Sequence, residues 1–415
     1  MSKSAPSPKR ASDAVRYLDT PAAAEDFLRG LRDVRLLALD TEGASFHRFV
    51  DRIYLLQLTA RAGDGAETSA ILDPLAVGPL PALGELLADA DVEVVFHDAD
   101  YDLRLLHQDY GWHPRPLFDT RIAAQLLGLR AFGLAALLER EFDVKLDKKH
   151  QRADWSMRPL TPDMLDYAAQ DTRFLPELRD RLRAQLEKAG RLAWAEEEFA
   201  RLEGTRWAEE DASQAFLKLK GARDLNRREL ALLRELVIWR DGVAAQLDRS
   251  TFRVAGNEVL LDIARRAPRT REELASIKGV PRGSLESRGA EMLEAVARGV
   301  AVPDAELPRF PRAPRWDRDP DFDARVSRLR GLRDDAAQRL DLDPGVLLSR
   351  ERLEAVARKN PATLDELAAM PELRRWQVAE LGESLLAELR EVARIVAGAA
   401  AAPASDGAAP AAAPP

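Results

Sequence analysis

Short apolar runs alternate with turn residues between Val34 and His97. The runs read VRLLALD, RIYLLQLT, SAILD and VEVVFH, with one helical stretch among them. Runs of this length, rich in β-branched residues and bounded by turn residues, are typical of β-strands. The pattern therefore predicts a mixed sheet at the start of an α/β domain.

From Asp100 onward the apolar residues recur every three or four positions, as in helices. The segments are DLRLLHQDY, RIAAQLLGL, GLAALLEREF and TPDMLDYAAQDTRFL. Thr161 is placed to cap the last of these helices, with Pro162 at its first position. Strands followed by helices over roughly 200 residues predict one α/β domain, which we place at residues 13–205.

An internal repeat follows this domain. The segment RRAPRTREELASIKGV matches RKNPATLDELAAMPEL, and upstream Leu260 aligns with Leu353. A repeated pattern of helical period predicts two copies of a small all-helical unit. We place these copies at residues 206–302 and 320–397.

Three segments lie outside these predicted domains. Residues 1–12 are expected to be flexible, residues 303–319 form a Pro-rich linker, and residues 398–415 consist almost entirely of Ala, Pro and Gly. Such a tail lacks the large apolar residues that a fold requires, so we expect it to be disordered. Because no apolar stretch of signal-peptide or membrane-spanning length is present, we expect a cytoplasmic protein with no membrane partner.

Composition narrows the possible chemistry. The chain has no cysteine, which excludes disulfides, thiolate metal sites and cysteine nucleophiles. Its five histidines show no HxxxH or HExxH spacing, and no GxxxxGK[ST] motif is present, which argues against a zinc site and a bound nucleotide cofactor. A net charge of -8 argues weakly against broad coating of nucleic acid, although a local basic stripe would suffice for phosphate contacts.

Two carboxylates lie at the end of the first strong strand pattern, LLALD. Asp40 and Glu42 are two positions apart, so they lie on one face of a strand, where they repel each other unless neutralised. A divalent cation would neutralise them. For an isolated pair, a solvated strand end is the better explanation of the pattern, so alone the pair is a weak signal.

Further acids lie on two of the predicted helices. Asp98, Asp100 and Asp102 open the helix that follows VEVVFH, and capping accounts for one or two of them but not for three. Tyr167 and Asp171 are four positions apart and therefore share a helix face. Taken alone, this pair is better explained by an ordinary amphipathic helix.

The ordered set of an Asp-x-Glu strand end, an aspartate at a helix start and a Tyr-x-x-x-Asp helix resembles the tyrosine branch of the DEDD exonuclease superfamily. The blocks DTEGASFHRFVDRIYLLQLT, HDADYDLRLL, LFDTRIAAQLLGL and ADWSMRPLTPDMLDYAAQDTRFL most resemble the ribonuclease D family. The repeated helical unit resembles the HRDC domain. The resemblance implies a ribonuclease H-like α/β domain, with a mixed sheet and flanking helices, followed by two small all-α HRDC-like domains.

The resemblance also implies which residues act. It gives four metal ligands and one tyrosine that orients the attacking water: Asp40, Glu42, Asp102, Asp171 and Tyr167. Asp100 remains a rival to Asp102. Hard carboxylate oxygens suit two divalent cations, Mg²⁺ or Mn²⁺, held about 3.5–4 Å apart for phosphodiester hydrolysis.

Several other residues are candidates for contact with substrate. The predicted contacts are Lys148, Lys149, His150, Arg152 and Arg158. A charge cluster is often only a solvated face, and for Trp155 we favour packing in the core. Capping of the next helix explains Asp119 and Thr120.

Basic residues also recur in the first repeated unit. We expect the helical units to bind or position RNA through arginines of this unit, with simple surface charge as the alternative. The arginines are Arg227, Arg228, Arg265 and Arg266.

We therefore predict a metal-dependent 3′-to-5′ exoribonuclease that hydrolyses RNA with a free 3′ end and releases nucleoside 5′-monophosphates. The resemblance implies transfer-RNA precursors as substrates, and we expect a monomer. One alternative is an exonuclease for single-stranded DNA, because the contacts to the 2′-hydroxyl are not legible in the sequence. Another is a non-catalytic RNA-binding scaffold, against which the intact carboxylates and tyrosine argue.

Overall fold

The computed structural model describes residues 15–147, 149–208, 211–280, 282–311 and 320–401. These residues fall into two compact units. The first unit holds residues 15–119, 138–179 and 202–311, and the second holds 120–137, 180–201 and 320–401. The predictions for residues 1–12, for Lys148 and for the tail beyond 401 lie outside the described residues.

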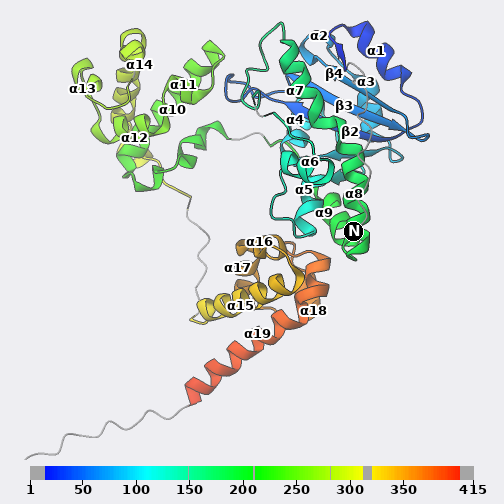
Figure 1. Ribbon diagram of the computed structural model, residues 1–415. Coiled ribbons are helices and arrows are strands. Elements are labelled where there is room, and N and C mark those ends of the chain that lie inside the picture. Colours follow the sequence, from blue (N-terminus) through cyan, green and yellow to red (C-terminus); the bar gives the residue numbers. More distant parts are fainter. Residues whose placement is uncertain (1–14, 148, 209–210, 281, 312–319, 402–415) are drawn as a thin grey trace, which may run out of the picture. The chain divides into compact units, whose positions relative to one another are not determined.

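Six strands form one mixed sheet in the order β1-β4-β3-β2-β5-β6 (Figure 1). The strands are β1 (Arg16–Leu18), β2 (Val34–Glu42), β3 (Leu55–Ala62), β4 (Glu67–Leu72), β5 (Glu93–Phe96) and β6 (Leu117–Asp119). Strand β3 runs antiparallel to β2 and β4, whereas the other neighbours are parallel. The predicted mixed sheet is confirmed, although β1 and β6 did not show in the sequence because three residues are too few to reveal a period.

The central strand β2 positions the chemistry of the domain. Leu37, Ala38 and Leu39 are fully buried, because the strand is covered on both faces and reads as a continuous apolar run. Helix α7 (Pro162–Arg173) packs against β2, β3 and β4. Polar residues at the end of β2 therefore lie beside a polar face of this helix.

Several helices of the α/β domain begin at a proline that follows a capping side chain. Thr20, Asp73 and Thr161 each accept a hydrogen bond from a backbone amide of the first turn, and the predicted Thr161 cap is thereby confirmed. The remaining helices are α1 (Pro21–Gly30), α2 (Pro74–Val77), α3 (Pro81–Ala88), α4 (Asp100–Tyr110), α5 (Thr120–Leu126), α6 (Leu134–Phe142), α8 (Leu175–Lys188) and α9 (Leu192–Leu202).

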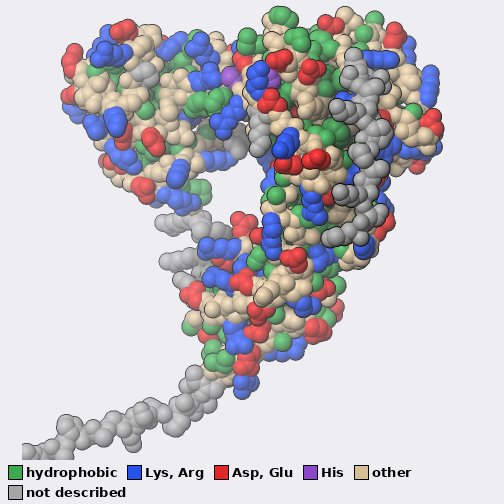
Figure 2. Space-filling model, in the orientation of Figure 1, with side chains coloured by type: hydrophobic (Ala, Val, Ile, Leu, Met, Phe, Trp, Pro, Cys, Tyr) green, Lys and Arg blue, Asp and Glu red, His purple; other side chains and the backbone are tan. Residues whose placement is uncertain are grey.

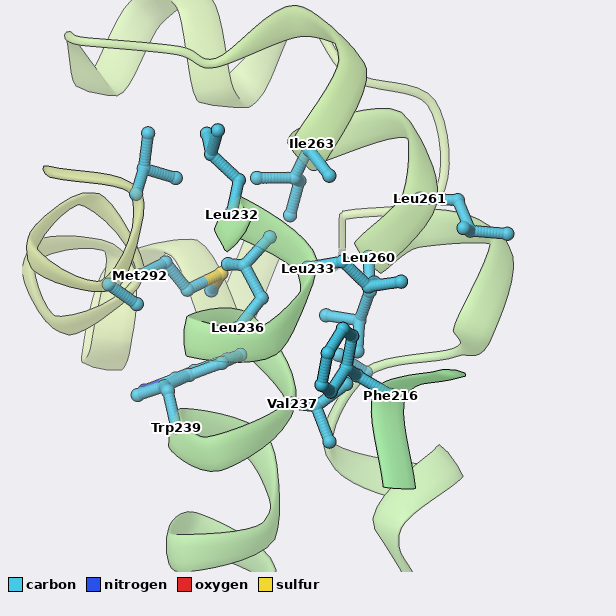
Figure 3. Close-up of a cluster of buried hydrophobic side chains, with 14 of the residues drawn as sticks. Phe216, Leu232, Leu233, Leu236, Val237, Trp239, Leu260, Leu261, Ile263 and Met292 are labelled. Carbon is cyan, nitrogen blue, oxygen red and sulfur yellow. The ribbon is translucent and has the colours of Figure 1, made fainter. Parts of the chain in front are cut away.

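The first helical module spans residues 212–306. Its elements are η1 (Ala212–Lys218), η2 (Ala222–Asp224), α10 (Arg227–Leu247), α11 (Thr251–Val254), α12 (Asn257–Arg266), α13 (Arg271–Ala275), α14 (Arg282–Ala301) and η3 (Asp304–Glu306). Figure 3 shows Leu233, Leu236 and Leu260 converging in its core, all fully buried. Helix α14 approaches α10 closely at Gly299, where a Cβ would lie 2.6 Å from the Cα of Leu232.

The second helical module spans residues 322–401. Its helices are α15 (Phe322–Leu340), α16 (Pro344–Leu347), α17 (Arg350–Lys359), α18 (Leu364–Ala368) and α19 (Arg375–Ala401). The repeat is visible in matching caps, since Thr270 and Thr363 each cap a short helix, and Asp248 and Asp341 each end the long first helix in a left-handed conformation. Helix α19 continues past the predicted start of the tail at residue 398, because alanine is the strongest helix former.

None of the helices in the described ranges combines the length and the hydropathy that a membrane span needs.

Candidate active site

The end of β2 carries the first two acidic residues of the site. Asp40 and Glu42 lie on one face of the strand, as the period of two predicts. Gln57 of β3 lies directly opposite Asp40 in the sheet and is fully buried. Its amide nitrogen approaches Oε1 of Glu42 at 3.5 Å, a long hydrogen bond that limits the rotation of this carboxylate.

Helix α7 brings the third acid to this place. Asp171 lies four residues after Tyr167, on the last turn of the helix. One oxygen from each of Asp40, Glu42 and Asp171 lies within 4.8 Å of the others. Two segments more than a hundred residues apart thus form one carboxylate cluster, which we call the acidic cluster.

Asp102 joins the acidic cluster from helix α4. Both the backbone amide and the hydroxyl of Thr41 donate to its Oδ1, at 3.0 and 2.6 Å. Asp100 instead points to solvent, where its side chain is 49% exposed and pairs with Arg104. The structure therefore favours Asp102 over its sequence rival, because only Asp102 is held against the strand that carries Asp40 and Glu42.

The gathering of one buried and three half-buried acids in one place changes how they ionise. Burial, followed by repulsion from the neighbouring carboxylates, raises the pKa of Asp40 and Glu42 well above the usual range. Burial also raises the pKa of Asp171 to about 7, and that of Asp102 to about 7 despite the hydrogen bonds from Thr41, which lower it. At neutral pH the acidic cluster retains protons that ordinary carboxylates have lost.

In the described part of the chain, no lysine or arginine forms an ion pair with any of these four acids. Buried charges are normally paired or coordinate a metal. The donor set consists of carboxylate oxygens only, which are the ligands that hard divalent cations prefer. The acidic cluster therefore fits the use of a divalent metal.

Tyr167 lies beside the acidic cluster, with its ring 6.1 Å from that of Trp155 and 5.9 Å from that of His150. Burial and the nearby carboxylates raise its pKa far above the usual tyrosine value. Its hydroxyl makes no hydrogen bond within the described residues. Tyr167 is thus a protonated, available hydrogen-bond donor rather than a base. Trp155 is 1% exposed, which confirms the expected packing role.

The predicted substrate contacts differ in how available they are. Lys149 is 60% exposed and pairs with Asp163 at 2.9 Å. Arg152 is exposed, and its carbonyl oxygen lies 3.0 Å from Nε2 of His47. His150 keeps a buried Nε2 that has no partner within the described residues.

The structure does not support the prediction that Arg158 contacts substrate. Its guanidinium donates to both oxygens of Asp73 and to the carbonyls of Trp155, Met157 and Tyr54. Asp73 also accepts from the hydroxyl of Tyr17 at 2.7 Å. Each of the three guanidinium nitrogens is thus engaged within the protein, so Arg158 ties the loop of residues 153–158 to the sheet instead of facing a phosphate.

Two of the arginines predicted to bind RNA in the first helical module are also engaged. Arg228 donates to three carbonyls at the end of α14 and to Asp304, and Arg227 donates to the carbonyls of Asp304 and Leu307. Both residues hold the end of the module together. On the face of the first helical module that Figure 2 shows, Lys and Arg side chains are intermixed with Asp and Glu side chains, and charges of one sign do not form a patch of their own.

Sequence reasoning missed several residues that shape the site. Thr41 and Gln57 hold two of the acids, and of these two only Thr41 carried a signal, namely its place between Asp40 and Glu42. Asp119 of β6, for which capping of the next helix was predicted, accepts a hydrogen bond from the amide of Ala99 before α4.

Gly43 is the third residue that sequence reasoning missed. A Cβ there would overlap the hydroxyl of Tyr101, which donates to Asp51 at 2.7 Å. The absence of a side chain at Gly43 therefore lets this hydrogen bond hold the loop between β2 and β3 against α4.

Comparison with known proteins agrees with this geometry. A 3′–5′ exonuclease family model matches residues 15–187, and the HRDC domain model matches residues 229–296 and 322–389. A ribonuclease D of Granulibacter bethesdensis is 36% identical over 86% of this chain and 88% of its own length. This chain belongs to the ribonuclease D family.

Two solved structures are similar to this chain over most of its length. A protein from Bifidobacterium adolescentis matches 90% of this chain and 97% of its own, with 26% identity and a TM-score of 0.77. Escherichia coli RNase D, described as an exoribonuclease involved in structured RNA processing, matches 91% of this chain and 99% of its own, with 25% identity and a TM-score of 0.69. The α/β domain followed by helical HRDC units is confirmed, and the activity class is that of a 3′–5′ exoribonuclease.

Proposed function

We propose that this ribonuclease D hydrolyses structured RNA from a free 3′ end and releases nucleoside 5′-monophosphates, with transfer-RNA precursors as substrates. The observation that carries the proposal is the acidic cluster, in which oxygens of Asp40, Glu42 and Asp171 lie within 4.8 Å of one another and, among the described residues, no lysine or arginine pairs with them. The name and title of its relatives, ribonuclease D and structured RNA processing, support RNA as the substrate class. We further propose a cytoplasmic monomer.

The proposed metal ligands are Asp40, Glu42, Asp102 and Asp171, which would hold two Mg²⁺ or Mn²⁺ ions. When bound, such ions neutralise charge on the phosphate and favour hydroxide over water at neutral pH. Thr41 fixes one oxygen of Asp102, so this ligand is oriented before substrate arrives. Gln57 restrains Glu42 in the same way.

The other residues position the scissile phosphate and the attacking water. Tyr167 keeps its proton, so its hydroxyl would donate to the water and direct an oxygen lone pair at phosphorus. Lys149 and Arg152 would contact the backbone of the RNA, since both are exposed. Lys148 and His150 remain proposed contacts from the sequence.

The test uses a 5′-labelled transfer-RNA precursor with a 3′ extension, the full-length protein and either Mg²⁺ or EDTA. We expect a ladder that shortens from the 3′ end in Mg²⁺ only. Asp102→Asn should abolish it, whereas Asp100→Asn, its matched neighbour on α4, should leave it within about twofold because exposed ion pairs matter little.

Two outcomes would contradict the proposal. Equal degradation of a DNA strand of the same sequence would favour the alternative of an exonuclease for single-stranded DNA. Binding of the RNA without shortening, under Mg²⁺ and under Mn²⁺, would favour the non-catalytic scaffold.

A further inference from the structure

The second compact unit contains a cavity of about 430 Å³ that is separate from the acidic cluster. Helix α5 and the following loop form one wall, and α16 and α17 of the second helical module form another. A cavity of this size holds more than a simple ion and is in the range of small-molecule sites.

Arg352 is the only lysine or arginine on the wall of this cavity, and it is half-buried. In the described part of the chain its guanidinium makes no hydrogen bond or ion pair. Arg374 and Arg201 add positive charge nearby, and burial together with this charge lowers the pKa of Arg352 despite Glu198. A half-buried guanidinium with no hydrogen-bonded counter-ion is suited to an external anion.

The repeat shows that the fold does not require this arginine. Arg352 precedes Leu353 on α17, just as Val259 precedes Leu260 on α12 of the first helical module. Val259 is partly buried and packs against the core of its own module. An apolar residue therefore satisfies the fold at this register, and the second module has a cation there instead.

The rest of the wall divides into an apolar and a polar part. Ile122, Leu126, Phe132 and Val346 provide apolar surface for a planar ring, and Gln125 offers an amide. Of the two acids, Glu198 is already neutralised, since Arg374 donates to both its oxygens at 3.0 and 2.9 Å.

Asp343 is the other acid on the wall and is exposed. Its Oδ1 accepts the amide of Gly345. A carboxylate that retains free lone pairs is suited to ribose hydroxyls, as in other nucleotide sites.

We propose that this cavity binds a ribonucleoside 5′-monophosphate, with its phosphate on Arg352, its ribose hydroxyls on Asp343 and its base against the apolar wall. The proposal is independent of the nuclease assignment, because it uses no residue of the acidic cluster. It names a second nucleotide site on the chain.

The test is calorimetric titration of the full-length protein in EDTA with adenosine 5′-monophosphate, 2′-deoxyadenosine 5′-monophosphate and inorganic phosphate. We expect saturable binding of the ribonucleotide and weakening by about tenfold or more in Arg352→Met, since a charge-assisted contact is lost. The matched control Arg350→Met removes an exposed arginine of the same helix, which pairs with Glu354, and should leave binding unchanged. Val346→Trp, which fills the cavity while keeping the arginine, should abolish binding and covers the case in which Arg352→Met fails to fold.

The outcomes that overturn the proposal are equally definite. Absence of saturable binding, or equal affinity in wild type, Arg352→Met and Val346→Trp, would show that the cavity is not a nucleotide site. Equal affinity for inorganic phosphate would show a simple anion site, and equal affinity for the deoxyribonucleotide would remove the role of Asp343.

Loss of nuclease activity in Asp102→Asn with retained nucleotide binding would separate this site from the proposed function.

Discussion

Two groups of charged side chains that are shielded from solvent in the α/β domain are built in opposite ways. In one, Arg158 and Asp73 neutralise each other, and Tyr17 and three carbonyls complete the hydrogen bonds. In the other, the acidic cluster gathers four carboxylates of the same sign. A group whose opposite charges cancel stabilises the fold, whereas a group of like charges needs a ligand of opposite charge.

The pKa shifts follow the same division. Burial alone would raise the pKa of Asp73, but the hydrogen bonds from Arg158 and Tyr17 outweigh it and the pKa is lowered. In the acidic cluster the opposite balance holds, and every carboxyl pKa is raised. Asp73 is therefore charged in the folded protein without a bound cation, whereas the acidic cluster becomes fully charged only when cations bind.

The largest expected effect is on activity. Asp40→Asn removes a carboxylate at the centre of the acidic cluster, so we expect the rate of 3′ shortening to fall by about 10⁴-fold, or ~5.5 kcal/mol in the activation barrier. The folded protein without metal should be no less stable, because one repelling charge is gone. Single-turnover kinetics and a denaturant melt would measure the two quantities, and a variant that unfolds more readily while keeping its activity would contradict the comparison.

Arg158→Met should lower the stability and leave the rate unchanged, the reverse of Asp40→Asn. It leaves Asp73, whose side chain is 2% exposed, buried without its partner, so we expect a loss of about 3–5 kcal/mol in the free energy of unfolding. Under conditions where the variant is folded, its rate per folded molecule should stay near that of wild type. A rate that collapses in fully folded Arg158→Met would instead restore the predicted contact with substrate.

The third prediction concerns pH. Asp171 has a folded pKa of about 7 against 3.8 for a free aspartate, so its contribution to stability is complete below about pH 4 and is lost as pH rises toward 7. Between pH 5 and 7 we expect the metal-free wild type to lose about 2–3 kcal/mol relative to Asp171→Asn. Parallel stability curves for the two proteins in EDTA would contradict this, and added Mn²⁺ should flatten the difference.

The smallest expected effect distinguishes two half-buried tyrosines, Tyr167 and Tyr17. Tyr167→Phe should lower the rate by about tenfold, roughly 1.4 kcal/mol, because the proposed hydrogen bond to the attacking water is lost. Stability should not change, because this hydroxyl makes no hydrogen bond within the described residues. Tyr17→Phe removes a hydrogen bond to a charged group and should cost about 1.5–2 kcal/mol of stability without changing the rate. Comparing rate and melting curve in both variants measures this, and equal behaviour of the two would refute the distinction.

Much of the fold is legible in the sequence. Strands β2 to β5 were predicted because their apolar runs are long enough to show a pattern, and Thr161 with Pro162 marked the start of α7. The internal repeat in the sequence predicted both helical modules. Strands β1 and β6 were not found, since their pairing depends on partners elsewhere in the sheet and not on three residues of their own.

The site was legible in part, for a similar reason. Spacing and resemblance pointed to Asp40, Glu42, Asp102 and Asp171 and left Asp100 as a rival to Asp102, and the hydrogen bonds from Thr41 to Asp102 favour Asp102. The partner of Arg158 is Asp73, 85 positions away, so no local pattern could show that its donors are engaged. Long-range partners are what the sequence alone conceals.

Gly43 has a consequence for reading natural variants of this protein. It follows Glu42 directly, and the space that its missing side chain leaves is filled by the Tyr101 hydroxyl. An alanine at this position would have to displace the Tyr101 hydroxyl and with it the hydrogen bond to Asp51, although glycine itself contributes no chemical group. In a mutational survey, effects at Gly43 would therefore report on the attachment of the loop to α4 and not on a further catalytic group, because the contribution of this residue is empty space.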